Sequence, residues 1–457
     1  MESIPVELVL EILQYSGAII SQNVLDALCQ RMSDVRERRL RHNKNPPESP
    51  SAHQELDYLL HGALKINAAL ALVCRQWHEI FVPFLYSTFY ARSSHAAKFI
   101  LRTLEANPAL CTHIWQIIAI PADLESWTPH FPDAIDTLVS LCPNVVRFTL
   151  FHRDVFSDGE SGPLASKPLI QRTRRQWNHL RYLTVSSLTW DSLVTYIIAI
   201  AGSSKLQNLH IHDVGIQRIN FTEARGYLPP HRDLFSLREL AISNADSHCL
   251  DLLRYFRFSR LRSFTFHGDV DDFTELALAA FLGPDFFSLE YLSLPYSTLR
   301  HHRIILPSGS YTISTRLKTL VLTFINLGDT IGAPKFPRVP LHRVETLRIT
   351  SAREPSYTLL TQNSFRVWLG GLCDKRRMPD LSQLRIDVTL RTLKKEDMET
   401  VEPRLRDIET SLRAKKVVLK VLDASGTKFA TLSAVLDARL TEMVESDLAA
   451  PATFAWQ

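Results

Sequence analysis

A six-residue pattern recurs along the middle of this 457-residue chain and constrains its fold more than any other feature. Each copy has an apolar residue, two variable residues, a second apolar residue, one variable residue and a third apolar residue. The nine copies are VVRFTL from Val145, LRYLTV from Leu180, LQNLHI from Leu206, LRELAI from Leu237, LRSFTF from Leu261, LEYLSL from Leu289, LKTLVL from Leu317, VETLRI from Val344 and LSQLRI from Leu381. Because they follow in order, most at similar spacing, we interpret them as a structural repeat.

The repeat predicts an α/β solenoid. The second and third apolar residues of a copy are two positions apart, so on a strand both side chains point to the same face. Amphipathic stretches between the copies, such as Asp191–Ala201 and Thr274–Leu282, are long enough to return the chain as a helix. We therefore expect parallel strands stacked on a concave face with helices outside. Successive copies start 35, 26, 31, 24, 28, 28, 27 and 37 residues apart, and the middle of that series matches the period of leucine-rich repeats.

Composition and charge exclude several other classes of protein. With 45% hydrophobic and 22% charged residues, wholesale disorder is not expected. A formal net charge of +4 is too small and too spread out for a duplex-binding patch, so nucleic acid is not expected as a partner. The longest nearly apolar run, Leu193–Ala201, is about half of a bilayer span, so no membrane partner is expected.

Cysteine spacing and the N-terminus indicate an intracellular protein. The six cysteines are at least 31 residues apart, without the close pairs of zinc modules or disulfide scaffolds. Glu2, Glu7 and Glu11 interrupt the first apolar stretch, which is unlike a signal peptide. We expect a location in the cytoplasm, the nucleus or both.

Two helical patterns precede the repeats. Ser3 can cap a helix whose first turn contains Pro5 and whose remainder, to Leu13, is apolar on almost every face. Such a helix must be buried by its own chain or by another protein. From Asn67 a second pattern places Leu70, Val73, Trp77, Ile80 and Phe84 at three- and four-residue steps, and predicts a helix that ends near Pro83.

These two patterns resemble the F-box family. Ile4–Leu13 (IPVELVLEIL) is similar to the family's LPxEL helix, Ala71–His78 (ALVCRQWH) to its VCxxW segment, and Pro83–Tyr86 (PFLY) to its short apolar turn. About 40 extra residues separate the first helix from the VCxxW segment, and Ile4 stands where leucine is usual. The entropic cost of closing a loop grows only logarithmically with the number of residues in it, so an insertion of this size adds little to that cost.

The resemblance implies a function and a set of partners. A three-helix F-box docks onto a Skp-type adaptor, which joins a cullin-based ubiquitin ligase, while C-terminal leucine-rich repeats select a target protein. The order of this chain is similar to that of the F-box proteins with leucine-rich repeats found in fungi. Carried over position by position, the residues implied to contact the adaptor are Pro5, Leu8, Ile12, Val73, Cys74, Trp77, Leu85 and Tyr86.

The predicted organisation has four parts. Residues 1–95 form the F-box-like helical module, with an inserted segment at about 16–63 that holds the basic run RERRLRHNK. Residues 96–392 form the solenoid, and 393–445 form a capping region that contains a helix, a strand from Val417 and a second helix from Phe429 to Val444. A mobile tail follows over 446–457.

The concave face is the expected site for the target protein. Its predicted residues alternate with the core positions, and few of them are charged, which suits a protein or peptide better than a polyanion. Aromatic residues are favoured as anchors. The candidate contacts are Phe151, Tyr182, His210, His212, His267, Tyr291, Arg348 and Arg385. Binding through loops or through the convex side remains an alternative.

Catalytic motifs are missing from the sequence. It contains no GxGxxG, GxxxxGK[ST], GxSxG or HExxH motif. His210 and His212 share a strand face and His267 follows two repeats on, but no carboxylate or cysteine completes a metal site beside them. We therefore predict a non-enzyme without a cofactor or a metal. The leading hypothesis is a substrate-recognition subunit, the second a ligase-independent repeat scaffold, and the third a metal-dependent hydrolase.

Overall fold

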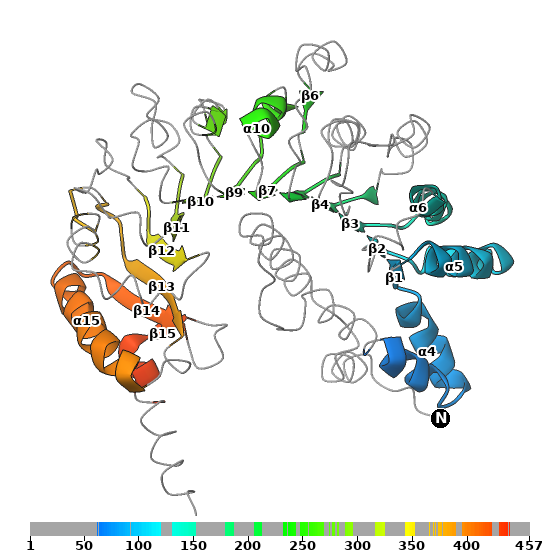
Figure 1. Cartoon of the computed structure of the whole chain (residues 1–457), viewed down its shortest axis with the longest axis horizontal. Coiled ribbons are helices and arrows are strands. Elements are labelled where there is room, and N and C mark those ends of the chain that lie inside the picture. The colour runs from blue at the N-terminus through cyan, green and yellow to red at the C-terminus, as the bar shows by residue number, and fades with distance from the viewer. Residues whose placement is uncertain are drawn as a thin grey trace, which may run out of the picture. The chain divides into compact units, whose positions relative to one another are not determined.

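The computed structural model of the chain describes most of residues 62–119 and 247–268, together with the segments that form the strands beyond them (Figure 1). Those segments are 130–151, 179–186, 205–212, 236–243, 288–295, 316–324, 343–351, 378–389, 395–422 and 429–436, with a few short pieces between them. The helix predicted within residues 3–13 lies outside the described residues. So does the 16–63 insertion except for 62.

The fold is mixed α/β, built on a 13-stranded, mostly parallel sheet whose strands follow the order of the chain. This confirms the predicted stacking of consecutive parallel strands. A separate two-stranded parallel sheet consists of β6 (Arg232–Asp233) and β8 (Phe256–Arg257). The chain divides into two compact units, residues 1–260 and 261–457.

The first unit holds six strands of the main sheet in the order β1, β2, β3, β4, β5, β7. Their bounds are Thr88–Ala91, Gln116–Ala119, Arg147–Phe151, Tyr182–Ser186, Asn208–His212 and Glu239–Ser243. The register joins the third residue of each hexad to that of the next, as in the series Arg147, Tyr182, Asn208. The two apolar residues of each strand therefore stack on those of its neighbours in one core.

Two strands precede the first predicted hexad. β2 follows the same pattern from Ile114, with Ile117 and Ala119 at the second and third apolar positions, and β1 carries Phe89 and Ala91 there. Ala91 and Ala119 are fully buried. The parallel sheet thus begins well before Val145.

Helices cover one side of the first unit's strands. They are α5 (Ser94–Ala106), α6 (His130–Leu141) and α10 (Ser247–Leu253), with a 3₁₀ turn, η1, over Pro108–Thr112 (Figure 1). Leu104 of α5 and Leu138 of α6 are fully buried in the core. Ser93 caps α5, because its hydroxyl accepts a hydrogen bond from the Ala96 amide at 3.2 Å.

The second unit holds the strands β9 to β15 in sequence order. Their bounds are Ser263–His267, Tyr291–Pro295, Thr319–Phe324, Thr346–Ser351, Gln383–Thr389, Val418–Leu422 and Phe429–Thr431. All pairings from β9 to β14 are parallel, whereas β15 pairs antiparallel with β14. Phe264 begins a ladder of buried residues that continues through Leu292, Leu320, Leu347, Leu384 and Leu419.

The C-terminal part of this unit departs from the prediction at one point. A long helix, α15 (Lys395–Arg413), precedes β14 as expected. The helix predicted from Phe429 is wrong at its start, because Phe429–Thr431 forms β15 and the helical turns begin at Leu432. Pairing with Leu422, Val421 and Lys420 of β14 satisfies backbone groups that a sheet edge would otherwise expose.

The residues that alternate with the core positions define the polar face of the sheet. Several of them are buried, including Thr149, Thr184 and Ser293 at 4%, 4% and 1% exposure. The polar face is therefore accessible only at particular side chains. No helix among the described residues is both long and apolar enough to cross a membrane.

Candidate functional site

The first candidate surface is a turn between two N-terminal helices. The single helix predicted from Asn67 is instead broken: residues 64–71 are helical, and α4 (Arg75–Leu85) begins after a turn at Leu72–Cys74. Cys74 has an extended backbone, with φ −162° and ψ 171°, and its carbonyl accepts the first bond of α4, from the His78 amide at 2.8 Å. The His78 ring nitrogen Nδ1 lies 3.3 Å from the Ala71 carbonyl oxygen, which ties the two helices together.

The helix was predicted to end near Pro83, and α4 ends two residues later, at Leu85. Proline has no N–H to donate, so its position in the last turns removes one helical bond. The helix nevertheless closes, since the Tyr86 amide donates to the Val82 carbonyl at 3.1 Å.

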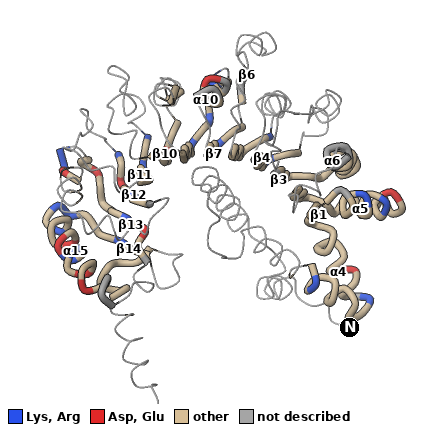
Figure 2. Tube along the Cα trace, viewed as in Figure 1, with Lys and Arg blue, Asp and Glu red and all other residues tan. Residues whose placement is uncertain are grey.

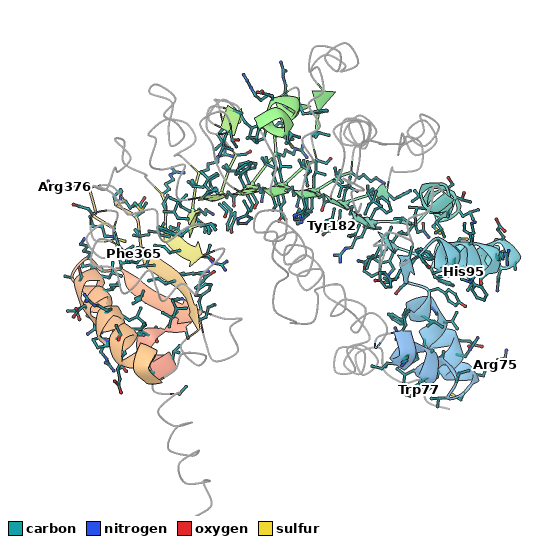
Figure 3. The ribbon with its side chains drawn as sticks, in the orientation of Figure 1. Arg75, Trp77, His95, Tyr182, Phe365 and Arg376 are labelled. Carbon is teal, nitrogen blue, oxygen red and sulfur yellow. The ribbon has the colours of Figure 1, made fainter. Side chains whose placement is uncertain are left out.

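This break leaves apolar side chains in solvent. Leu72 is 83% exposed and Val73 is 62% exposed, and Cys74 is exposed as well. Trp77, labelled in Figure 3, is partly buried instead. Its ring stacks on that of Phe81 with centroids 5.4 Å apart. We call residues 72–74 the apolar turn.

The structure separates the predicted adaptor contacts into three groups. Val73 and Cys74 are exposed on the apolar turn, whereas Trp77, Leu85 and Tyr86 are partly buried. Pro5, Leu8 and Ile12 lie outside the described residues. Leu72 was missed by the sequence reasoning, because the interpretation of 67–84 as one helix assigned no special position to it.

A second candidate surface is the polar face of the first unit. Tyr182, which is labelled in Figure 3, is partly exposed there. The Arg147 guanidinium lies 4.4 Å from the ring centroid of Tyr182 and 5.3 Å from that of Trp115. Cation–π contacts of this kind hold the guanidinium in place. Arg147 and Trp115 were not among the predicted contacts. Phe151 was a predicted contact, but its side chain is not among those that the structure describes.

The paired histidines of β5 lie on the same face. His210 Nε2 is 3.4 Å from Glu239 Oε1, and the Asn208 amide donates to the other oxygen of that carboxylate. The hydrogen bond with His210 is the main cause that lowers the pKa of Glu239, while burial opposes it. His212 is only 4% exposed and offers little contact surface. Within the described part of the chain, no group of three His, Cys, Asp or Glu residues could hold a metal.

The third candidate surface is the polar face of the second unit. Arg348 makes a bidentate ion pair with Asp387, with Nη2 to Oδ2 at 2.7 Å and Nε to Oδ1 at 2.9 Å. The ring of Phe429 lies 5.2 Å from the Arg348 guanidinium and 5.4 Å from that of Arg385. Of these residues, Asp387 and Phe429 were missed as candidates, the latter because it was placed in a helix.

Two further predicted contacts belong to this surface. His267 lies near Arg348 on the polar face; burial first, and the positive charge of Arg348 second, lower its pKa to about 4. It is therefore a neutral imidazole at neutral pH. Tyr291 is partly exposed one strand along. Burial opposes the charge of Arg348, but the hydrogen bond and negative charge of Asp387, with a smaller contribution from Tyr291, raise the pKa of that arginine above its ordinary value.

Searches against protein-family models and against curated proteins give no match to this chain.

Proposed function

We propose that this chain is the substrate-recognition subunit of a Skp/cullin/F-box ubiquitin ligase. In this proposal the N-terminal helices bind a Skp-type adaptor, and the leucine-rich repeats hold a target protein. The observation that carries it is the exposure of Leu72 and Val73 within the segment that resembles the VCxxW motif.

The physical argument concerns where large apolar side chains meet solvent. Among the described residues, four large hydrophobic side chains are exposed, namely Leu72, Val73, Phe99 and Val418. Two of these are adjacent in sequence, on the apolar turn. Contiguous exposed apolar surface is typical of protein interaction sites, whereas scattered single residues need no explanation. A partner that covers the apolar turn removes this surface from water.

The mechanism in this proposal is proximity. A subunit that holds both the adaptor and the target raises the effective concentration of the target's lysines near the ubiquitin-loaded enzyme. It needs no acid, base or nucleophile of its own, so all covalent steps belong to its partners.

A ligase-independent scaffold is the second candidate function, and one observation favours it. Ala71 and Phe81 form a small buried cluster against which Trp77, Val82 and Phe84 pack. The α4 helix that carries most of this cluster ends three residues before β1 begins at Thr88. A helical cap on a solenoid would show the same packing, because a terminal repeat must cover its core.

Adaptor capture discriminates between the two candidates. The full-length chain is co-expressed with a Skp-type adaptor and passed over a size-exclusion column. Co-elution in equal amounts is expected for the ligase subunit, and its loss on Leu72→Ser with Val73→Ser identifies the apolar turn as the contact. Separate elution of a folded chain and a folded adaptor would rule out the ligase proposal and leave the scaffold.

A further inference from the structure

Three basic residues form a row on the polar face of the second unit. Arg348 of β12 pairs in register with Arg385 of β13, and Arg385 pairs with Lys420 of β14 (Figure 2). Neighbouring strands lie about 4.8 Å apart, so the three Cβ atoms span about 10 Å on one face. The same register position holds Thr265, Ser293 and Val321 on β9, β10 and β11. Positive charge is therefore concentrated on the last three parallel strands. We call Arg348, Arg385 and Lys420 the cation row.

Only part of this charge is neutralised. Asp387 pairs with Arg348, and its side chain is 14% exposed. Among the described residues, neither Arg385 nor Lys420 has a carboxylate partner; Arg385 Nη2 donates instead to the neutral Gln383 Oε1 at 3.1 Å. Within the described residues, two of the three positive charges of the row therefore lack a carboxylate in salt-bridge contact.

The arginines of the row are held in place before any ligand arrives. The Phe429 ring lies within 5.4 Å of both guanidiniums, and β15 fixes that ring by pairing Phe429 with Leu422. Side chains that are already ordered lose less conformational entropy on binding. The buried Nε of Arg385 has no hydrogen-bond partner, so part of this guanidinium's capacity to donate is unused.

We propose that the cation row binds an acidic segment of the target protein, through two carboxylate side chains in an extended stretch. Side chains two residues apart in an extended segment point the same way, about 6.6 Å apart, whereas Arg385 and Lys420 lie on strands about 4.8 Å apart. The long, flexible lysine stem lets the Lys420 ammonium make up this difference. Charge-assisted hydrogen bonds from arginine to carboxylate are among the strong ones in proteins. This inference rests on the proposed function, in which the repeats bind the target protein.

Carboxylates fit the row better than a phosphate group. Phosphate sites in proteins commonly use free backbone N–H groups at helix N-termini or glycine-rich turns. The row lies instead on strands whose backbone groups pair with their neighbours, from β11 through β14. The available donors are therefore side chains spread in a line.

The test is binding of a fluorescein-labelled hexaglutamate peptide to the full-length chain, followed by fluorescence anisotropy at about 50 and 200 mM salt. We expect saturable binding that weakens with salt, and a loss of at least about tenfold for Arg385→Gln with Lys420→Gln. The matched control is Arg316→Gln with Lys318→Gln, which removes the same charge at exposed positions outside the row. This control should bind as the unmodified chain does.

Three results would overturn the proposal. The first is absence of hexaglutamate binding, and the second is an equal loss in the control pair. In the third, a phosphoserine peptide binds more tightly than hexaglutamate, which would replace the carboxylate assignment. Adaptor co-elution is measured on the same variants. If the unmodified chain co-elutes with the adaptor but does not bind hexaglutamate, only the cation row is refuted; if it binds hexaglutamate but does not co-elute with the adaptor, only the ligase proposal is.

Discussion

Replacing the two exposed side chains of the apolar turn should weaken adaptor binding without unfolding the protein. Fully burying a leucine or valine side chain contributes about 1.5–3 kcal/mol. Leu72 has 83% of its surface left to bury and Val73 has 62%, which scales to about 2 and about 1 kcal/mol. Their sum, about 3 kcal/mol, corresponds to roughly a hundredfold in the dissociation constant. We therefore expect Leu72→Ser with Val73→Ser to weaken adaptor binding by about that factor.

Isothermal titration of the full-length chain with a Skp-type adaptor measures the effect. Phe99→Ser is the matched control, because Phe99 is a large side chain on α5 with 65% exposure and lies outside the apolar turn. Both variants replace exposed residues, so their free energies of unfolding, measured in urea, should stay within about 0.5 kcal/mol of the parent. Unchanged adaptor affinity in the double variant, or an equal loss in Phe99→Ser, would refute the assignment of this turn.

Three other predictions concern the second unit. Phe264→Ala should lose about 3–5 kcal/mol of unfolding free energy in urea, because Phe264 is fully buried with its ring 5.2 Å from that of Phe281; a loss below about 1 kcal/mol would contradict this packing. The pKa of His267 falls from 6.5 to about 4 on folding. Between these two pH values only the unfolded chain takes up the proton, so the free energy of unfolding is unaffected above pH 6.5 and decreases by up to about 3 kcal/mol as the pH falls to 4. His267→Gln should flatten that part of the stability profile, and an unchanged slope would count against a neutral imidazole at this position. Asp387→Asn should lower the free energy of unfolding by only about 1 kcal/mol, because the Arg348 side chain is 38% exposed and solvent screens its ion pair with Asp387. The same change should tighten hexaglutamate binding by adding a net positive charge to the row, and weaker binding would argue against it.

The strand register is the feature that sequence predicts best in this chain. The apolar residues of each hexad must face one core, and a slip of one residue would turn them all to the polar face. Leu183, Leu209 and Leu240 accordingly stack in register. The strands β1 and β2 escaped the search because their third apolar position is alanine, Ala91 and Ala119, which a pattern of larger aliphatic and aromatic residues excludes.

The break between the two N-terminal helices could not be predicted from local signals. Leu70, Val73 and Trp77 keep helical spacing across it, and no glycine or proline marks the turn. Contacts between the two helices accompany it instead: the His78 ring approaches the Ala71 carbonyl, and Ala71 and Phe81 are buried together. Tertiary packing of this kind routinely overrides propensity.

The polar partners of the cation row were equally hidden. Alternation placed Arg348 and Arg385 on the polar face, but the ion pair of Arg348 with Asp387 joins residues 39 positions apart. The contact with Phe429 depends on β15 turning back beside β14, where helical spacing had been expected. Pairing across repeats requires the stacking itself, which no single hexad encodes.

The two proposed binding surfaces belong to different compact units, and this makes their failures separable. The apolar turn lies in residues 1–260 and the cation row in residues 261–457. Substitutions that share no partner usually have additive effects. Leu72→Ser with Val73→Ser should therefore abolish adaptor capture and leave hexaglutamate binding intact, while Arg385→Gln with Lys420→Gln should do the reverse. Either pair should stop ubiquitination of an acidic target, so a ubiquitination assay alone cannot distinguish them. A variant pair that loses both bindings at once has lost its fold, and its urea midpoint would show it.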